Sequence, residues 1–185
     1  GYKVHLIDIS EKSLERGLAN IGKNLDRMVN KGILNAEQVR ETLAGIEVFT
    51  DLATGVKNVE LVVEAATEEV SLKKKIFREL DAHCPEGTIL ATNTSSISIT
   101  EIGAATQRAD KVIGMHFMNP VPVMKLVEVI RGYSTSDAVT QKILELSEKL
   151  GKTPTEVNDY PGFVANRILM PMINEAIESL YHGVA

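Results

Sequence analysis

The sequence lacks several features that particular classes of protein require. Its single cysteine, Cys84, cannot form a disulfide within the chain, so a reducing compartment, the cytoplasm, is the expected location. No apolar run reaches the about 18 residues that a membrane-spanning helix needs, so no membrane partner is expected. A formal net charge of −5 argues against a nucleic-acid-binding protein, which would carry a basic excess. The four histidines are scattered without the spacing of metal ligands, so no metal is expected.

The chain also has no repeats and no G-x-S-x-G motif, which makes a serine hydrolase less attractive. What it has is an ordinary composition, with 44% hydrophobic and 24% charged residues, as in globular proteins. Its 185 residues suffice for one domain, or for one domain and the start of another.

Apolar runs of strand length alternate with segments of helical periodicity along most of the chain. Strands are expected at 2–9, 47–50, 60–66, 88–93, 111–117, 125–130 and 153–157. Helices are expected after the first, third, fourth and sixth of these strands, and a last helix at 162–181. This alternation predicts an α/β fold with a mostly parallel sheet. Such sheets bind ligands at the carboxyl ends of their strands.

Four polar residues close apolar strands: Asp8, Glu64, Asn93 and His116. An acid at the position of Asp8 accepts hydrogen bonds from the adenosine ribose in dinucleotide-binding units and favours NAD over NADP, although an aspartate before a helix is common in any α/β protein. The glycine fingerprint that accompanies such an acid would lie before Gly1. The chain opens within a strand and closes on a very apolar helix, so we expect a segment of a longer protein.

The segment "ATNTSSISI" (91–99) follows a strand and holds five consecutive hydrogen-bonding side chains. Ser98 has the spacing of a helix N-cap, which leaves Asn93 and Ser95 less explained. Their groups are suited to a ribose, a nicotinamide amide or a substrate oxygen, or to stabilising the loop itself.

The segment "GMHFMNPVPVMKLVEVI" (114–130) contains one histidine and one glutamate in two otherwise apolar strands. If the chain reverses near Pro122, Glu128 lies opposite or close to His116. The carboxylate would then fix the imidazole tautomer and leave the other nitrogen as a base. A lone buried histidine with a satisfied partner is the alternative.

Two further features have both a functional and an ordinary interpretation. Asn166 lies in the otherwise apolar start of the last helix and needs a partner, which is either a substrate carbonyl or a neighbouring loop. Lys23, Arg27 and Lys31 form a basic stripe that suits the phosphates of coenzyme A, or is a solvated face.

Three motifs together resemble the NAD-dependent L-3-hydroxyacyl-CoA dehydrogenases, including the 3-hydroxybutyryl-CoA dehydrogenases. They are "NTSS" (93–96), the segment 114–130 and "PGFVANRI" (161–168). The resemblance covers essentially the whole chain. It implies a Rossmann-type doubly wound domain at 1–159, without its first strand and glycine loop, and the first helix of an all-α C-terminal domain at 160–185.

The resemblance also implies roles for individual residues. His116 would be the catalytic base for the 3-hydroxyl and Glu128 its orienting partner, while Ser95 and Asn166 would hold the substrate. Ser95 would also belong to the NAD site. The other residues that line this site would be Asp8, Ala66, Thr67, Glu68, Lys73, Asn93 and Asn119. An acyl-CoA substrate and a homodimer formed through the C-terminal domain are implied as well. The alternatives are a non-catalytic NAD-binding member of the fold and a dehydrogenase of another β-hydroxy acid or sugar acid.

Overall fold

The computed structural model describes residues 1–184, which form two compact units. The first unit comprises residues 1–59 and 82–86, and the second comprises residues 60–81 and the chain from residue 87 onward. Within residues 1–184, no helix combines the length and apolarity needed to cross a membrane.

The first unit is built on a parallel pair of short strands, β1 (Val4–Ile7) and β2 (Ile46–Phe49). Its helices are α1 (Glu11–Asn30), α2 (Ala36–Ala44) and α3 (Leu52–Gly55). The backbone N–H of Ser13 donates to the Ser10 side chain, so Ser10 is the N-cap of α1. The unit therefore contains a strand, two helices and a second parallel strand, which is the predicted alternation.

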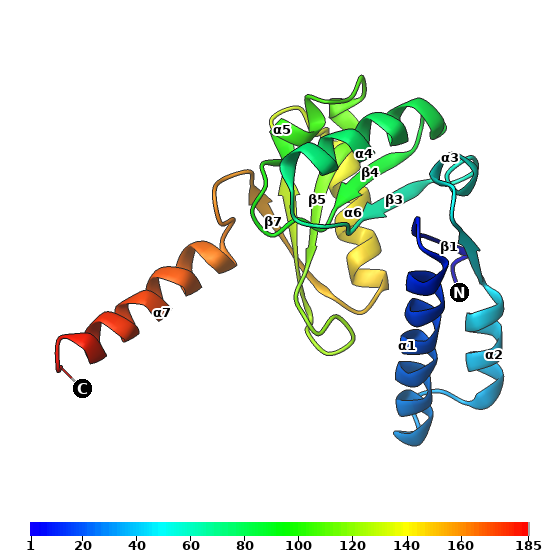
Figure 1. Cartoon of the computed structure of the whole chain (residues 1–185), viewed down its shortest axis with the longest axis horizontal. Helices are drawn as coiled ribbons and strands as arrows, with labels where there is room; N and C mark the ends of the chain where they lie inside the picture. The colour runs from blue at the N-terminus through cyan, green and yellow to red at the C-terminus, as the bar shows by residue number, and fades with distance from the viewer. Residues whose placement is uncertain (185) are drawn as a thin grey trace. The chain divides into compact units, whose positions relative to one another are not determined.

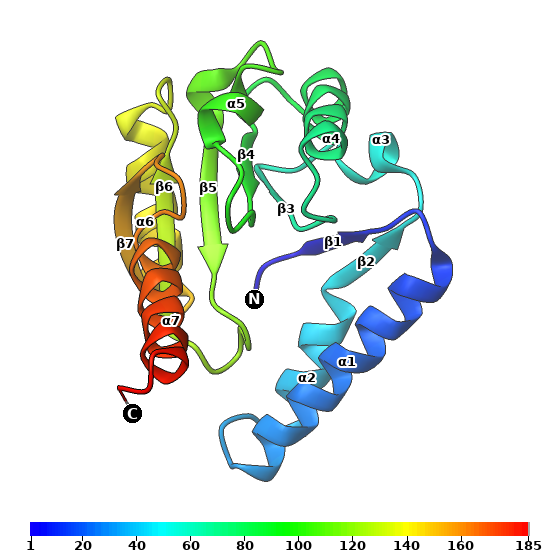
Figure 2. The ribbon, with the colours of Figure 1, turned by 60° about the vertical axis from the view of Figure 1, so that its left-hand side comes forward.

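The second unit contains a five-stranded sheet in the order β3-β4-β5-β6-β7, which can be followed in Figure 2. All neighbouring strands are parallel except β5 and β6, which are antiparallel. The strands are β3 (Leu61–Glu64), β4 (Ile89–Thr92), β5 (Val112–Phe117), β6 (Leu126–Arg131) and β7 (Thr153–Asn158). The helices are α4 (Val70–His83), whose last residues cluster with the first unit, α5 (Ile99–Gly103), α6 (Asp137–Lys149) and α7 (Ala165–Tyr181). A short 3₁₀ helix spans Ala109–Lys111. The predicted α/β class with a mostly parallel sheet is confirmed.

The two faces of the β5–β6 strand pair carry different side chains: one face is apolar, and the other carries polar groups. Ile113 and Met115 pack with Val127 and Val129 in an apolar cluster that also includes two residues of α6. Because side chains alternate along a strand, the residues between them lie on the opposite face. That face carries His116 and Glu128, so it is the face that positions the site.

The chain reaches α7 through a tight turn rather than by starting the helix at residue 162, as predicted. Gly162 has φ of 80° and Phe163 has φ of 50°, both in the left-handed region, so regular helix begins at Ala165. No residue of α7 is buried, and Figure 1 shows the helix extending beyond β7. Its apolar residues, such as Ile168, Ile177 and Leu180, are exposed.

Candidate active site

His116 and Glu128 are directly opposite each other on the antiparallel strands β5 and β6. Residues paired in this way have their side chains on the same face of the sheet. The Nδ1 atom of His116 lies 2.9 Å from Oε2 of Glu128, and both side chains are buried. The predicted chain reversal and the proximity of the two residues are therefore confirmed.

Ser95 extends this pair into a chain of three side chains. Its Oγ lies 3.0 Å from Nε2 of His116, on the side of the imidazole opposite Glu128. Because the ionised carboxylate of Glu128 can only accept, a neutral imidazole holds its proton on Nδ1. Nε2 then accepts from the Ser95 hydroxyl, and it is the nitrogen available to act as a base.

The other oxygen of Glu128 bonds to the backbone at the start of α7. The N–H groups of Val164 and Ala165 donate to Oε1 of Glu128 at 3.0 and 2.9 Å. The Phe163 ring lies beside the imidazole, with the ring centroids 5.8 Å apart. A left-handed conformation of a residue other than glycine costs about 1–3 kcal/mol, so the surrounding packing must hold it. The sequence does not reveal these contacts, and only the "PG" before Phe163 signals the turn.

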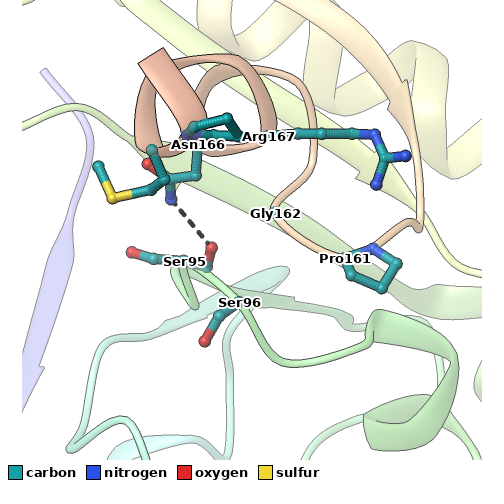
Figure 3. A pocket seen from close by; sticks show the side chains of 8 residues that line it. Ser95, Ser96, Pro161, Gly162, Asn166 and Arg167 are labelled. Atoms are coloured by element: carbon teal, nitrogen blue, oxygen red, sulfur yellow. Dashed lines mark hydrogen bonds between the residues drawn. The ribbon is translucent and has the colours of Figure 1, made fainter. Parts of the chain in front are cut away.

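Asn166 lies one residue further along α7 and contacts the serine loop. Its Nδ2 donates to the backbone carbonyl of Ser95 at 3.2 Å, as Figure 3 shows. This is the neighbouring-loop alternative for its partner, and the predicted substrate contact stays a prediction. The two residues also line an open pocket of about 480 Å³, together with Ser96, Pro161, Gly162, Arg167, Met170 and Pro171.

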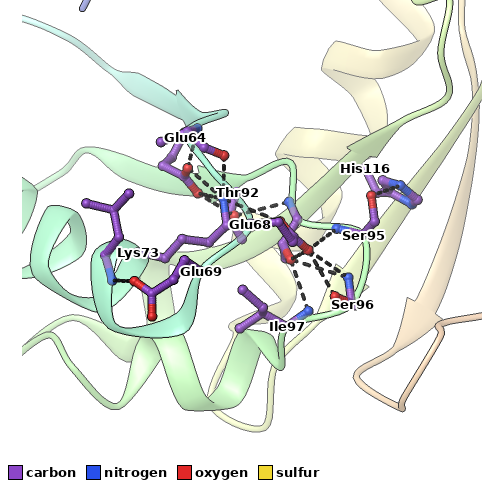
Figure 4. Close-up of polar contacts among 12 residues, drawn as sticks. Glu64, Glu68, Glu69, Lys73, Thr92, Ser95, Ser96, Ile97 and His116 are labelled. Carbon is purple, nitrogen blue, oxygen red and sulfur yellow. Dashed lines mark hydrogen bonds and ion pairs between the residues drawn. The ribbon is translucent and has the colours of Figure 1, made fainter. Parts of the chain in front are cut away.

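Glu68 holds the backbone of the serine loop. Its Oε1 accepts from Ser95 N–H at 2.9 Å, from the N–H and hydroxyl of Ser96, and from the Thr94 hydroxyl (Figure 4). Burial opposes ionisation of this carboxyl, but these hydrogen bonds and the charge of Lys73 outweigh burial and lower the pKa of Glu68. Glu68 thus fixes the residue that contacts His116.

A second buried acid–base pair lies at the end of β3. Lys73 Nζ donates to both oxygens of Glu64, at 2.7 and 2.9 Å, and to the Ala66 carbonyl at 3.2 Å. Glu64 also accepts from the Thr92 hydroxyl and from the Ala66 N–H. Lys73 is 1% exposed, and the three acceptors match the three N–H donors of its ammonium group. In this geometry its ammonium faces protein groups, and the predicted NAD contact of Lys73 stays a prediction.

The remaining predicted NAD residues are spread over both units. Ala66 and Thr67 are exposed directly after β3, and Asn119 is exposed after β5. Asn93, half-buried after β4, accepts from the Phe117 N–H at 2.8 Å and so links the ends of β4 and β5. Asp8 belongs to the first unit, where it accepts from the Ser10 N–H. The parallel strands β3, β4 and β5 end at the same edge of the sheet, so all of these residues except Asp8 follow strands that end there.

Residues 1–160 match the family model of the 3-hydroxyacyl-CoA dehydrogenase NAD-binding domain. The chain belongs to this family. Membership confirms the resemblance drawn from the sequence motifs and identifies the cofactor as NAD. The region that matches the family ends at Tyr160, directly before the turn that leads into α7.

The relatives of this chain are similar to it over its whole length. It is 49% identical to a probable 3-hydroxybutyryl-CoA dehydrogenase of Bacillus subtilis and 47% identical to a 3-hydroxybutyryl-CoA dehydrogenase of Clostridioides difficile. Each alignment covers 100% of this chain but only 64% and 66% of the two relatives. The chain thus spans less than two thirds of their length.

Solved structures of the family share the fold of this domain. The (S)-3-hydroxybutyryl-CoA dehydrogenase of Ralstonia eutropha is 48% identical, with a TM-score of 0.95 over 99% of this chain and 64% of its own. A 3-hydroxybutyryl-CoA dehydrogenase of Escherichia coli is 42% identical, with a TM-score of 0.96 over 100% of this chain and 39% of its own.

Proposed function

We propose that the protein is an oxidoreductase that interconverts (3S)-3-hydroxyacyl-CoA and 3-oxoacyl-CoA with NAD, in fatty-acid β-oxidation or butyrate metabolism. The observation that carries the proposal is the hydrogen-bonded chain Ser95–His116–Glu128, with distances of 3.0 and 2.9 Å between its groups. Membership of the dehydrogenase family and the names of the relatives support the same reaction class.

The residues divide the work of the proton transfer. Nε2 of His116 takes the proton of the substrate's 3-hydroxyl, and Glu128 stabilises the imidazolium that forms. The Ser95 hydroxyl, which lies against Nε2, holds the substrate oxygen at that nitrogen. Asn166 positions the substrate carbonyl from the start of α7. In the reverse direction His116 returns the proton as an acid.

The strand ends suit the nicotinamide half of NAD. Asn93 and Ser95 are half-buried there and combine amide and hydroxyl groups, while Ala66, Thr67 and Asn119 are accessible. Glu68 supports this edge through the serine loop, and Lys73 supports it through Glu64. Asp8 would accept hydrogen bonds from the adenosine ribose. NAD supplies the hydride acceptor, and the protein supplies orientation and the base.

The substrate and partner assignments have separate support. An acyl-CoA substrate is in keeping with the relatives' names, and the basic stripe of α1 would contact the CoA phosphates. The exposed apolar side chains of α7 support a homodimer formed through a C-terminal helical domain, for which α7 is the first helix. The chain has one cysteine, Cys84, and so cannot form an internal disulfide, which is in keeping with a cytoplasmic location.

The test is NADH oxidation by the intact protein with acetoacetyl-CoA, with free acetoacetate as the matched control. Turnover with acetoacetyl-CoA and little with acetoacetate is expected, because the proposed substrate is the CoA thioester. Binding of NADH without turnover would contradict the proposal in favour of a non-catalytic NAD-binding protein. Turnover of a different hydroxy acid alone would contradict it in favour of a dehydrogenase of another substrate class.

A further inference from the structure

Phe163 has a backbone conformation that bulky residues rarely adopt. Within residues 1–184 it is the one non-glycine residue with positive φ, at 50°. Its side chain is 2% exposed, and its ring faces that of His116 at 5.8 Å with an interplanar angle of 60°. The burial of the ring therefore compensates for an unfavourable backbone beside the imidazole.

The two residues after Phe163 donate to the carboxylate that orients His116. Val164 N–H and Ala165 N–H both donate to Oε1 of Glu128, while Oε2 bonds to Nδ1 of His116. Glu128 is 2% exposed, so its charge depends on these protein donors rather than on water. With Oε1 held by two amides, the carboxylate has one orientation, and that orientation presents Oε2 to the imidazole.

Gly162 alone does not account for this arrangement. Its φ of 80° turns the chain, but the direction of the next two amides depends on the conformation of Phe163. The buried ring anchors that conformation, because moving φ out of the left-handed region would withdraw the ring from the His116 side.

We propose that Phe163 is a positioning residue of the His116–Glu128 pair. Its buried ring fixes the turn that delivers the Val164 and Ala165 amides to Glu128, and thereby fixes the proton of neutral His116 on Nδ1. This inference rests on the proposed role of His116 as the base. Phe163 acts through Glu128 and His116 and is not assigned a substrate contact.

The test compares Phe163→Leu with Phe163→Tyr and with Phe77→Leu in the intact protein. Phe77, on α4, is also fully buried but lies outside the polar site, so Phe77→Leu reports the general effect of losing a buried ring. Three quantities are measured for each variant. They are the ¹⁵N shifts of the His116 imidazole, the hydrogen exchange of the Val164 and Ala165 amides, and kcat and KM for NADH with acetoacetyl-CoA.

In Phe163→Leu we expect mixed imidazole tautomers and faster exchange of both amides. We also expect kcat to fall about tenfold to hundredfold with an unchanged KM for NADH, because the base is misplaced while the cofactor site is intact. Phe163→Tyr keeps the ring and should restore the tautomer and the slow exchange. Phe77→Leu should change none of the three quantities.

Wild-type tautomer and amide exchange in Phe163→Leu would overturn the proposal, and so would equal changes in Phe77→Leu. If Phe163→Leu does not fold, Phe163→Met is used in its place, because methionine is apolar and similar in volume to leucine. The results expected, and the results that would overturn the proposal, are the same as for Phe163→Leu. The spectroscopic results are independent of turnover. If the wild type fails to reduce acetoacetyl-CoA, the proposed function fails, while the imidazole and amide measurements still decide whether Phe163 positions the pair.

Discussion

The second unit buries two acid–base pairs near the same edge of its sheet. The pairs differ in whether any of their polar atoms can still bond to a ligand. All three N–H donors of Lys73 have protein acceptors, and both oxygens of Glu64 are bonded. His116 uses Nδ1 for Glu128, but its Nε2 contacts only a half-buried hydroxyl. We call Lys73–Glu64 the closed pair, because its polar atoms are all bonded within the protein. We call His116–Glu128 the open pair, because Nε2 of His116 contacts only the hydroxyl of Ser95, a residue that lines a pocket.

The difference shows that burial and pairing alone do not identify a catalytic acid or base. A buried pair that satisfies every polar atom fixes the local fold, here the ends of β3 and β4 through Thr92. A pair in which one nitrogen contacts only a hydroxyl retains a group that can exchange a proton with a substrate. We therefore expect substitutions in the two pairs to affect different quantities, stability in the first and turnover in the second.

The largest effect is expected when the closed pair is broken. Lys73→Met leaves the Glu64 carboxylate buried without its cation, which should lower the free energy of unfolding by about 3–5 kcal/mol. The measurement is urea unfolding followed by circular dichroism. The double variant Glu64→Leu with Lys73→Met should recover part of the loss, because no buried charge remains. A single variant as stable as the wild type would show that the pair does not hold the strand ends.

The next effect is expected when the open pair is altered without a change of shape. Glu128→Gln retains one acceptor oxygen for three donors, so it cannot serve both His116 and the α7 amides. We expect turnover with acetoacetyl-CoA to fall on the order of a hundredfold, because the imidazole tautomer is no longer fixed. Steady-state kinetics measures this, with NADH binding as the control. Full activity of Glu128→Gln would show that Glu128 does not orient His116.

A smaller effect is expected from packing on the face that carries the open pair. A Cβ on Gly114 would lie 2.8 Å from Cβ of Ile130 and 3.0 Å from Cδ1 of Ile99. Gly114→Ala should therefore cost about 1–3 kcal/mol of stability through overpacking. Gly87→Ala is the matched control, because nothing lies within 4 Å of its added Cβ. Equal unfolding midpoints for the two variants would contradict the close approach of Gly114 to these residues.

The smallest effect is expected from the pH dependence of Glu68, which supports the loop that contacts the open pair. Hydrogen bonds and Lys73 lower its folded-state pKa despite burial. The ionised group therefore adds stability that is fully present above its ordinary pKa of 4.5 and is lost as the pH falls through its lower folded value. The difference in unfolding free energy between wild type and Glu68→Gln should be constant from pH 7 to the ordinary pKa and shrink below it. A difference in unfolding free energy that grows on acidification would contradict the lowered pKa of Glu68.

Much of the fold and part of the site could be predicted from the sequence. Hydrophobic periodicity located the strands and helices of both units, and prolines after Phe117 indicated the reversal that pairs His116 with Glu128. These features depend on neighbours in the sequence or on one turn. Some strands were predicted too long, as at 2–9 against Val4–Ile7, because apolar residues continue beyond the hydrogen-bonded ladder, whereas β7 was predicted one residue short.

The contacts that the sequence could not predict join segments that are distant along the chain. Glu128 and Val164 are 36 residues apart, and Glu68 and Ser96 are 28 residues apart. Nothing in local periodicity specifies which carboxylate receives which amide. The left-handed conformation of Phe163 was equally hidden, because it depends on a ring buried against another strand.

The most direct test of the distinction between the two pairs is the turnover of His116→Gln with acetoacetyl-CoA and NADH in the intact protein. We predict a loss of about 10²–10⁴ in kcat, the range for removal of a general base. The free energy of unfolding should fall less than in Lys73→Met, because Glu128 keeps its two backbone donors. Unchanged turnover in this variant would contradict the assignment of His116 as the base, and with it the functional difference between the open and the closed pair.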